Sequence, residues 1–246
     1  MFPTPTPEAK AQLTKDGVLR AAINLANSLL VTGETPKGNP TGVAPDMAIA
    51  IAETLGAEVS YVTYPSPGLL ADGAAEEAWD IGLNAAEPRR AETIAFTAAY
   101  AEIEATYLVP TKSPIDSVEE VDKDGVKIVV SGRSAYDLYL TRSLRHAELT
   151  RGQGADATFK LFSSGGFDAL AGLRPSLLSL EKKLEGSRVL ADYFTTVQQA
   201  IGTPKSNDAG AKFLMEFAEE AKANNFVASL IEHYGLTGRL SVAPLS

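Results

Sequence analysis

The chain has 246 residues, of which 45% are hydrophobic and 22% charged, as is ordinary for a globular protein with a sizeable core. Its formal net charge of -9 argues against nucleic acid and anionic membranes as partners, because such partners need a basic face. The absence of cysteine excludes disulfides, thiolate catalysis and cysteine metal sites. Only two histidines occur, without the spacing of a metal-binding pair, so we expect no metal.

The first residues, "MFPTPTPEAKAQLTKDG", form a Pro/Thr-rich lead-in that we expect to be poorly ordered. They lack the basic region, apolar run and cleavage site of a secretory signal. We therefore expect a periplasmic or extracellular location if the chain is a mature form, and a cytoplasmic one if Met1 is the native start. No apolar run approaches the roughly 20 residues that cross a bilayer.

The first half of the chain alternates between strand-like and helix-like segments. Pro45 suits a first helical turn and Gly56 a helix end, with apolar residues at helical spacing between them. The expected order is strand 18–24, helix 45–56, strand 57–64, a weaker helix 68–79 and strand 80–84. Such alternation predicts a parallel sheet with crossover connections.

The second half repeats this pattern and predicts a second α/β lobe. The expected order is helix 117–123, strand 126–131, helix 134–145, strand 147–151, helix 156–164 and strand 167–173. A further strand, 195–204, and two helices, 208–224 and 226–235, complete the chain. "GQGADA" (152–157) matches the dinucleotide-binding fingerprint, but the match is weak and we interpret it as a loop.

Two arginines follow the predicted strand 80–84, in "AAEPRRAETIAFTAAY" (85–100). Ligands of open parallel sheets lie beyond the carboxyl ends of the strands. A guanidinium of Arg89 or Arg90 at that place could bind a carboxylate through two parallel hydrogen bonds. The alternative is that both arginines are solvated or pair with Glu87 and Glu92.

Similar polar residues follow other predicted strands. In "SGRSAYDLYL" (131–140), Ser134 is placed to cap a helix and to offer its hydroxyl and nearby amides to an anion, with Arg133 beside it. A plain helix cap is the alternative. Asn24 and Asn27 follow the first strand, and they either contact a ligand or satisfy their own turns.

Taken in order, "GVLRAAIN", "GVAPDMAIAIAETLGAEVSYV", "WDIGLNAAEPRRAETIAFTAAY", "GVKIVVSGRSAYDLYL" and "GFDALAG" resemble the family 3 extracellular solute-binding proteins, the amino-acid-binding components of ABC importers. The most specific part is an arginine followed six residues later by Phe-Ser/Thr and then Tyr, which falls on Arg90, Phe96, Thr97 and Tyr100. The resemblance implies that Arg90 holds the α-carboxylate of a ligand and that Arg89 is its more exposed neighbour. It also matches Ser134 to a helix-capping hydroxyl of the second lobe.

Two positions depart from the family pattern. Ala85 stands where the family usually has Ser or Thr, and Leu173 stands where it has the Asp that pairs with the amino group of the ligand. Because an unpaired buried ammonium is costly, the departures predict an anionic ligand without a free α-amine. Arg133 and Arg174, at or beside matching positions, would add positive charge.

The resemblance implies a two-lobed α/β type II periplasmic-binding-protein fold, each lobe with a mostly parallel sheet flanked by helices. Lobe 1 would comprise residues 1–107 and 201–246, and lobe 2 residues 108–200, with two hinge crossovers between them. We expect a small carboxylate, amino-acid-like or deaminated, bound between the lobes of a monomeric ABC-importer component that contacts a membrane subunit. We expect no cofactor, no nucleic acid and no catalysis. The expected ligand-binding positions are Arg90, Ser134, Arg133, Asn24, Asn27, Asn84, Ala85, Leu173 and Arg174.

Two other functions stay open. One is an enzyme like cyclohexadienyl dehydratase on the same scaffold, which would need a general acid with a raised pKa, and the candidate acids are Glu87 and Asp168. The other is a cytoplasmic ligand-sensing module, suggested by the missing signal.

Overall fold

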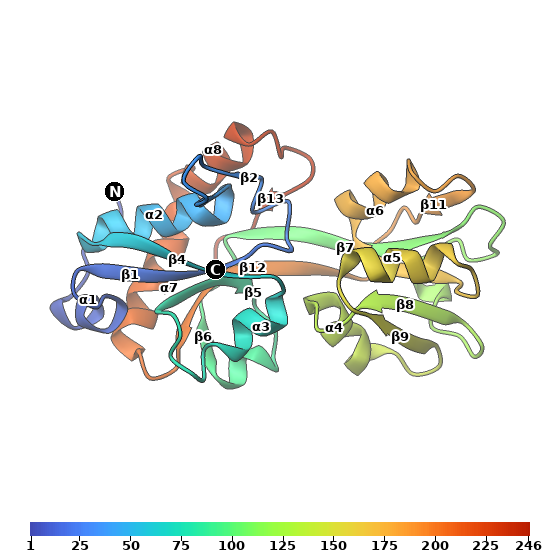
Figure 1. Ribbon diagram of the computed structural model, residues 1–246, viewed down its shortest axis with the longest axis horizontal. Coiled ribbons are helices and arrows are strands. Elements are labelled where there is room, and N and C mark those ends of the chain that lie inside the picture. The colour runs from blue at the N-terminus through green and yellow to red at the C-terminus, as the bar shows by residue number, and fades with distance from the viewer. The chain divides into compact units, whose positions relative to one another are not determined.

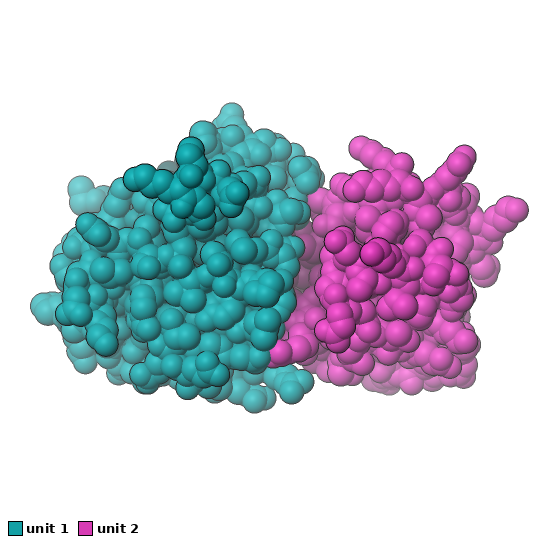
Figure 2. All heavy atoms as spheres, in the orientation of Figure 1, with its two compact units in different colours: residues 1–102, 198–246 teal, residues 103–197 magenta.

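The computed structural model describes residues 1–246 as two compact units (Figure 2). Unit 1 comprises residues 1–102 and 198–246, and unit 2 comprises residues 103–197. The chain passes between them twice, within β7 (Ala101–Pro110) and within β12 (Thr195–Pro204). The lobe boundaries expected from the sequence, after residues 107 and 200, fall inside the same two strands.

Unit 1 is built on three parallel strands in the order β4-β1-β5, with β12 antiparallel to β5 and β6 against β12 (Figure 1). The carboxyl ends of β1, β4 and β5 therefore meet at one edge of the sheet. Its strands are β1 (Val18–Asn24), β2 (Gly33–Glu34), β3 (Pro40–Thr41), β4 (Glu58–Tyr64), β5 (Ile81–Ala85), β6 (Ile94–Phe96) and β13 (Ser241–Val242). Its helices are α1 (Pro7–Leu13), α2 (Val43–Leu55), α3 (Pro67–Asp72), the 3₁₀ turn η1 (Arg90–Glu92), α7 (Asp208–Ala223) and α8 (Phe226–His233).

Glycines set both ends of α2. Gly42 precedes the helix with φ 139°, and a Cβ there would lie 2.4 Å from the carbonyl oxygen of Leu30. Gly56 ends the helix in the left-handed conformation, with φ 63°, as a helix-terminating glycine commonly does. The predicted helix is therefore confirmed, and it begins two residues earlier than expected, at Val43.

The N-terminal segment is ordered, so the expectation of a poorly ordered lead-in is wrong. Thr6 caps α1 by accepting a hydrogen bond from the backbone N–H of Ala9 at 3.1 Å, and Pro7 occupies the first helical turn. The ring of Phe2 stacks on Phe217 of α7 at a centroid distance of 4.3 Å. Tertiary packing of aromatic rings thus orders a segment whose composition is typical of a loop.

Unit 2 is built on the strand order β7-β10-β8-β9. Strands β10, β8 and β9 are parallel, whereas β7 is antiparallel to β10 and β11 is antiparallel to β7. The strands other than β7 are β8 (Lys127–Ser131), β9 (Glu148–Gly152), β10 (Ala169–Leu173) and β11 (Ser187–Val189). The helices are the 3₁₀ turn η2 (Val118–Glu120), α4 (Ala135–Ser143), α5 (Ala155–Ser163) and α6 (Arg174–Glu181).

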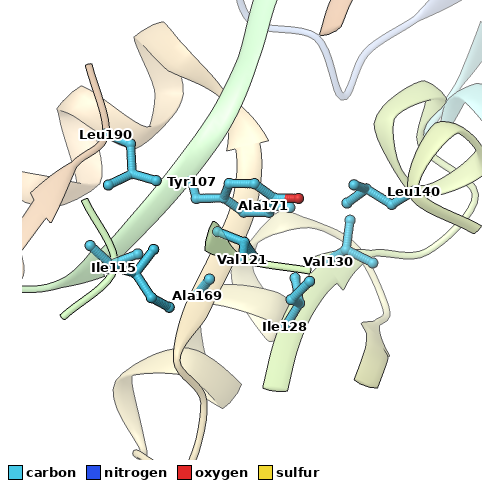
Figure 3. Close-up of a cluster of buried hydrophobic side chains, with 10 residues drawn as sticks. Tyr107, Ile115, Val121, Ile128, Val130, Leu140, Ala169, Ala171 and Leu190 are labelled. Atoms are coloured by element: carbon cyan, nitrogen blue, oxygen red, sulfur yellow. The ribbon is translucent and has the colours of Figure 1, made fainter. Parts of the chain in front are cut away.

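The sheet of unit 2 is buried on both faces. Successive side chains of a strand point to opposite faces, and the hydrophobic clusters follow that alternation. One cluster contains Tyr107, Ile128 and Val130 (Figure 3), whereas the other contains their neighbours Leu108 and Val129. Burial on both faces explains the nearly continuous apolar sequence of β8.

Four local expectations for helices and loops need correction. Helix 117–123 is only the 3₁₀ turn η2, and helix 68–79 ends at Asp72. Helix α6 was not predicted. "GQGADA" is not a loop throughout, because Gly152 ends β9 and Ala155 begins α5. A Cβ at Gly152 would lie 2.7 Å from the Cα of Thr158, so close packing of α5 on the strand requires glycine at that position.

Candidate functional site

Arg90 lies in η1, just beyond the carboxyl end of β5, and is only 5% exposed. The neighbouring Arg89 is exposed. A guanidinium is rarely buried without partners, because desolvation of a charge is costly. The burial of Arg90 therefore requires hydrogen-bond acceptors around its guanidinium.

Two oxygens at the end of β5 hold one terminal nitrogen of Arg90. Its Nη1 donates to the side-chain oxygen of Asn84 at 3.1 Å and to the carbonyl oxygen of Ala85 at 2.8 Å. Asn84 is itself fixed, because its amide donates to the carbonyl oxygen of Pro67 at 3.0 Å and its oxygen accepts from the N–H of Ala85 at 2.9 Å. Asn84, with only 2% exposure, therefore orients the arginine.

A buried carboxylate stands near the same turn. Glu87 is 5% exposed, and its Oε2 accepts a hydrogen bond from the backbone N–H of Arg89 at 2.9 Å. The bond holds the chain between β5 and η1 in the shape that brings Arg90 inward. Glu87 thus stabilises the backbone between β5 and η1.

The residues of the Phe-Thr-x-x-Tyr motif after Arg90 connect β6 to β12. The hydroxyl of Thr97 donates to the carbonyl of Ala98 at 2.6 Å and accepts from the N–H of Ile201 at 3.1 Å. Tyr100 is fully buried, its N–H donates to the carbonyl of Gln199 at 2.8 Å, and burial raises the pKa of its phenol. Thr97 and Tyr100 of the motif therefore serve to hold the backbone of β12, and Arg90 is left as the motif's charged residue.

In unit 2, the side chains of Ser134 and Asp137 both accept backbone N–H groups at the start of α4. The hydroxyl of Ser134 accepts from the N–H of Asp137 at 3.1 Å, and Oδ2 of Asp137 accepts from the N–H of Arg133 at 2.7 Å. Asp137 also pairs with Nε of Arg151 at 2.9 Å. The cap holds Arg133 exposed and in the left-handed conformation, with φ 62°. Ser134 itself is buried, with 7% exposure.

Asn24 and Asn27 satisfy their own turns. The side-chain oxygen of Asn24 accepts from the N–H of Ala26 at 3.1 Å, and that of Asn27 accepts from the N–H of Leu29 at 3.2 Å. Both side chains are half-buried at the carboxyl end of β1. Their role in ligand binding stays a prediction.

Leu173 and Arg174 mark the junction of β10 and α6. Leu173 precedes the helix without making a side-chain cap. The guanidinium of Arg174 pairs with Glu104 and donates to the backbone carbonyls of Leu190, Ala191 and Asp192. Arg174 therefore binds its own unit, and a ligand role for it stays a prediction.

Asp168, one of the two candidate acids, lies at the opposite end of β10 from Leu173. Its Oδ2 accepts from the backbone N–H of Lys127 at 2.8 Å. Five strand positions separate the two residues, or roughly 16 Å at about 3.3 Å per residue. Asp168 therefore does not take the place of the missing aspartate at residue 173.

No group of three His, Cys, Asp or Glu side chains is arranged to hold a metal ion.

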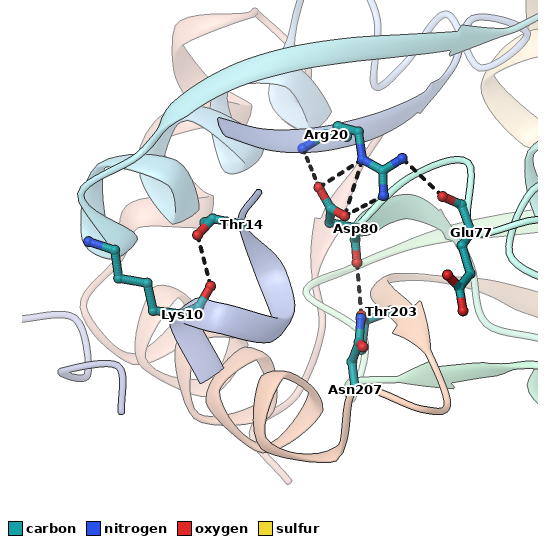
Figure 4. Close-up of polar contacts among 7 residues, drawn as sticks. All are labelled: Lys10, Thr14, Arg20, Glu77, Asp80, Thr203 and Asn207. Atoms are coloured by element: carbon teal, nitrogen blue, oxygen red, sulfur yellow. Dashed lines mark hydrogen bonds and ion pairs between the residues drawn. The ribbon is translucent and has the colours of Figure 1, made fainter. Parts of the chain in front are cut away.

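A second polar cluster of unit 1 lies at the amino end of β1, away from Arg90. Arg20 pairs with Asp80 at 2.6 Å, and its Nη1 donates to the carbonyl of Glu77 at 2.9 Å (Figure 4). The hydrogen bonds to Asp80 raise the pKa of Arg20. The pair borders a pocket of about 250 Å³, also lined by Lys15 and Asn207. Its polar groups tie β1 to β5, so we assign the cluster a structural role.

The sequence matches the model of the bacterial extracellular solute-binding proteins, family 3, over residues 30–237. The chain belongs to this family. No curated protein matches the sequence. No helix is both long and apolar enough to span a membrane.

Solved structures share the fold of this family 3 protein. The cysteine-binding protein of Campylobacter jejuni is 17% identical, with a TM-score of 0.77, and the match covers 96% of this chain and 99% of that one. A mutant of ArgBP from T. maritima is 18% identical, with a TM-score of 0.73 and coverage of 92% and 99%. An ancestral amino-acid-binding protein, a precursor of cyclohexadienyl dehydratase, is 21% identical, with a TM-score of 0.73 and coverage of 92% and 98%. The family 3 protein thus has the type II periplasmic-binding-protein fold predicted from its sequence.

Proposed function

We propose that this family 3 protein is the solute-binding component of an ABC importer and that Arg90 binds the carboxylate of a small ligand. The family match and the fold support the first part. Solved structures of similar fold include forms bound to arginine, lysine and glutamine, all of which carry an α-carboxylate. The α-carboxylate is therefore a group that all three ligands share, together with the α-ammonium.

The observation that carries the proposal is the fixed guanidinium of Arg90. A planar guanidinium held at Nη1 by Asn84 and Ala85 is already oriented, so a ligand does not have to order a flexible side chain. Burial lowers the local dielectric constant and strengthens a charge-assisted hydrogen bond. Both effects favour tight binding of an anion.

Unit 2 is proposed to contribute Ser134 and the amides at the start of α4. The positive end of the helix dipole favours an anionic group there. Arg133, exposed in the adjoining turn, would add a positive charge. Asn24, Asn27 and Asn84 supply amide groups at the ends of β1 and β5, where Asn84 acts chiefly through Arg90.

We further propose that the ligand lacks a free α-amine. The aspartate that would pair with an ammonium is replaced by Leu173, and the hydroxyl residue before the arginine is replaced by Ala85. Neither side chain can accept a hydrogen bond from an ammonium. Keto, hydroxy and aromatic acids fit such a site better than amino acids do.

The proposed function is binding without catalysis. One similar structure is a precursor of cyclohexadienyl dehydratase, which makes a dehydratase the alternative worth testing. The two candidate acids, Glu87 and Asp168, both accept backbone N–H groups within the scaffold. We expect no aromatic product when the protein is incubated with prephenate or arogenate, and a catalysed release of product would establish the alternative.

The decisive experiment compares Arg90→Ala with Arg89→Ala by calorimetric titration of small carboxylic acids. The two variants lose the same charge at neighbouring positions, one buried and one exposed. We expect Arg90→Ala to weaken binding about thirtyfold or more, because a buried charged hydrogen-bonding pair is worth about 2–5 kcal/mol and about 1.4 kcal/mol is tenfold, and Arg89→Ala to retain binding. Equal affinities of the two variants, both folded by circular dichroism, would overturn the assignment of Arg90.

A further inference from the structure

One guanidinium in unit 2 joins three parts of the chain. Arg174 begins α6 immediately after β10, and its side chain is 20% exposed. Its Nε pairs with Glu104 of β7. Its Nη1 donates to the carbonyl of Leu190 at 2.8 Å, and its Nη2 donates to the carbonyls of Ala191 at 3.0 Å and Asp192 at 2.7 Å.

These partners belong to the two segments by which the chain enters and leaves unit 2. Glu104 is the second residue of the unit, whereas Leu190–Asp192 lies just before β12 begins at Thr195. Further bonds hold the two segments together: the hydroxyl of Thr106 donates to the carbonyl of Asp192 at 2.6 Å, and the N–H of Phe194 donates to the carbonyl of Ala105 at 3.0 Å. We call the parts of β7 and β12 where the chain passes between the units the two crossings. Unit 2 thus holds both crossings in one hydrogen-bonded cluster centred on Arg174, which we call a clasp.

Unit 1 has a clasp of its own on the same two strands. The side-chain amide of Gln198 donates to Oε1 of Glu102 at 2.9 Å, and the N–H of Tyr100 donates to the carbonyl of Gln199 at 2.8 Å. Strand β13 also pairs with β7 at Glu102. The division between the units falls between the two clasps, after Glu102 on β7 and after Val197 on β12.

We propose that Arg174 is a positioning residue that fastens both crossings to unit 2 and so confines their bending to Ile103 and residues 195–197. The inference rests on the proposed function in one respect, that the two crossings act as the hinge of a ligand-binding protein. Because Arg174 directly follows Leu173, a ligand contact at the end of β10 would reach both crossings through one side chain.

Arginine is suited to this task in a way that lysine is not. The rigid fork of a guanidinium donates in several fixed directions, whereas an ammonium is a compact charge on a flexible stem. Glu104 has a side chain that is 43% exposed, so solvent weakens its ion pair with Arg174. The carbonyls of residues 190–192 should therefore contribute the larger share of the clasp, through hydrogen bonds to a charged donor.

The test is the distribution of distances between the units in the ligand-free protein. The chain has no cysteine, so Lys212→Cys in α7 and Lys160→Cys in α5, both exposed positions, would carry two unique spin labels for pulsed electron spin resonance. This labelled pair is combined in turn with Arg174→Met, Arg174→Lys and Glu104→Gln.

Arg188→Met is the matched control. Arg188 also lies in unit 2, with a side chain 28% exposed, and its Nη2 bonds the carbonyl of Ile115 and the carboxylate of Asp116, each at 2.7 Å. The substitution removes a similar set of side-chain bonds, all of them to residues 113–116, and leaves the backbone pairing of β11 with β7 in place.

We expect Arg174→Met and Arg174→Lys to broaden the distance distribution, Glu104→Gln to broaden it less, and Arg188→Met to leave its width unchanged. An unchanged width in all three clasp variants, or equal broadening in Arg188→Met, would overturn the proposal. Should Arg174→Met fail to fold, Arg174→Lys and Glu104→Gln decide. Arg90→Ala should leave the ligand-free width unchanged, so a failure of carboxylate binding and a failure of the clasp give different results.

Discussion

The side-chain oxygen of Asn84 accepts a hydrogen bond from Nη1 of Arg90 at 3.1 Å, and both residues are at least 95% buried. Asn84→Asp keeps this acceptor but turns it into an anion that competes with the ligand for the guanidinium, and it also loses the hydrogen bond to the carbonyl of Pro67. We expect binding of carboxylates to weaken about tenfold or more, which corresponds to at least about 1.4 kcal/mol. Calorimetric titration measures the loss, and Asn39→Asp, an exposed position of unit 1, controls for the added charge. Equal binding by Asn84→Asp and the wild type would mean that the charge of Arg90 is not used.

Gly42 and Gly38 offer a matched pair for the beginning of α2. Both have positive φ, 139° and 81°, but a Cβ at Gly42 would lie 2.4 Å from the carbonyl oxygen of Leu30, whereas a Cβ at Gly38 would have no neighbour within 4 Å. Gly38→Ala should therefore cost only about 1 kcal/mol of backbone strain. Gly42→Ala should cost more, because the chain around Leu30 must also move. Urea unfolding measures both, and similar losses for the two variants would contradict the close approach at Gly42.

The sequence predicted the elements whose cause is local. Pro45 and Gly56 delimit α2, and the apolar run of β8 follows from burial on both faces of its sheet. The order of α1 could not be predicted, because the ring of Phe2 packs against Phe217, which lies more than two hundred residues along the chain. Helix α6 has the same kind of cause, since Leu177 packs beneath β10 with Leu170.

The candidate site likewise has some features with a local cause and others that depend on tertiary contacts. The position of Arg90 follows from its place after a strand, and its greater burial than Arg89 accords with the motif. The fixed role of Asn84 depends on Pro67, which approaches only in the folded sheet. The partners of Arg174 likewise come from two segments distant in sequence, Glu104 in β7 and residues 190–192, so no local signal marks them.

Asp122 should make the stability of the protein depend on pH. Its partial burial acts to raise the pKa of this carboxyl, but hydrogen bonds from the backbone N–H groups of Ala147, His146 and Arg145 outweigh that effect and lower it. A folded-state pKa below the unfolded value, about 3.9, means that the stabilisation is fully present above that value and is lost as pH falls through the folded pKa.

Asp122→Asn should therefore lower the free energy of unfolding at pH 7 by no more than about 1 kcal/mol, because water screens these partly exposed hydrogen bonds to a charged acceptor. The difference from wild type should shrink as the pH falls below about 3.9, so it should be smaller at pH 2 than at pH 7. Urea unfolding at the two pH values measures this, with Asp124→Asn as the control, because the side chain of Asp124 is 92% exposed. A pH-independent difference would show that the charge of Asp122 contributes nothing.

The last prediction concerns the preference of the site between acids and amino acids, and it rests on Leu173. Without an acceptor at this position, a bound α-ammonium would lose its hydration without a paired carboxylate in exchange. A thermal-shift series should therefore rank keto, hydroxy and aromatic acids above the amino acids that share their side chains. The shift should grow with the logarithm of ligand concentration over the dissociation constant. Leu173→Asp should reverse the ranking by restoring the ammonium partner.

The Leu173→Asp substitution also suits the fold, because residue 173 precedes α6 with extended dihedral angles and makes no side-chain cap, a position where Asp is favoured. Loss of folding is thus not the expected outcome, and Leu173→Asn, which caps the helix without the charge, separates the two effects. If wild-type protein is stabilised by arginine, glutamine or leucine but not by the matched keto acids, an ordered water or another carboxylate binds the ammonium, and the site accepts ordinary amino acids.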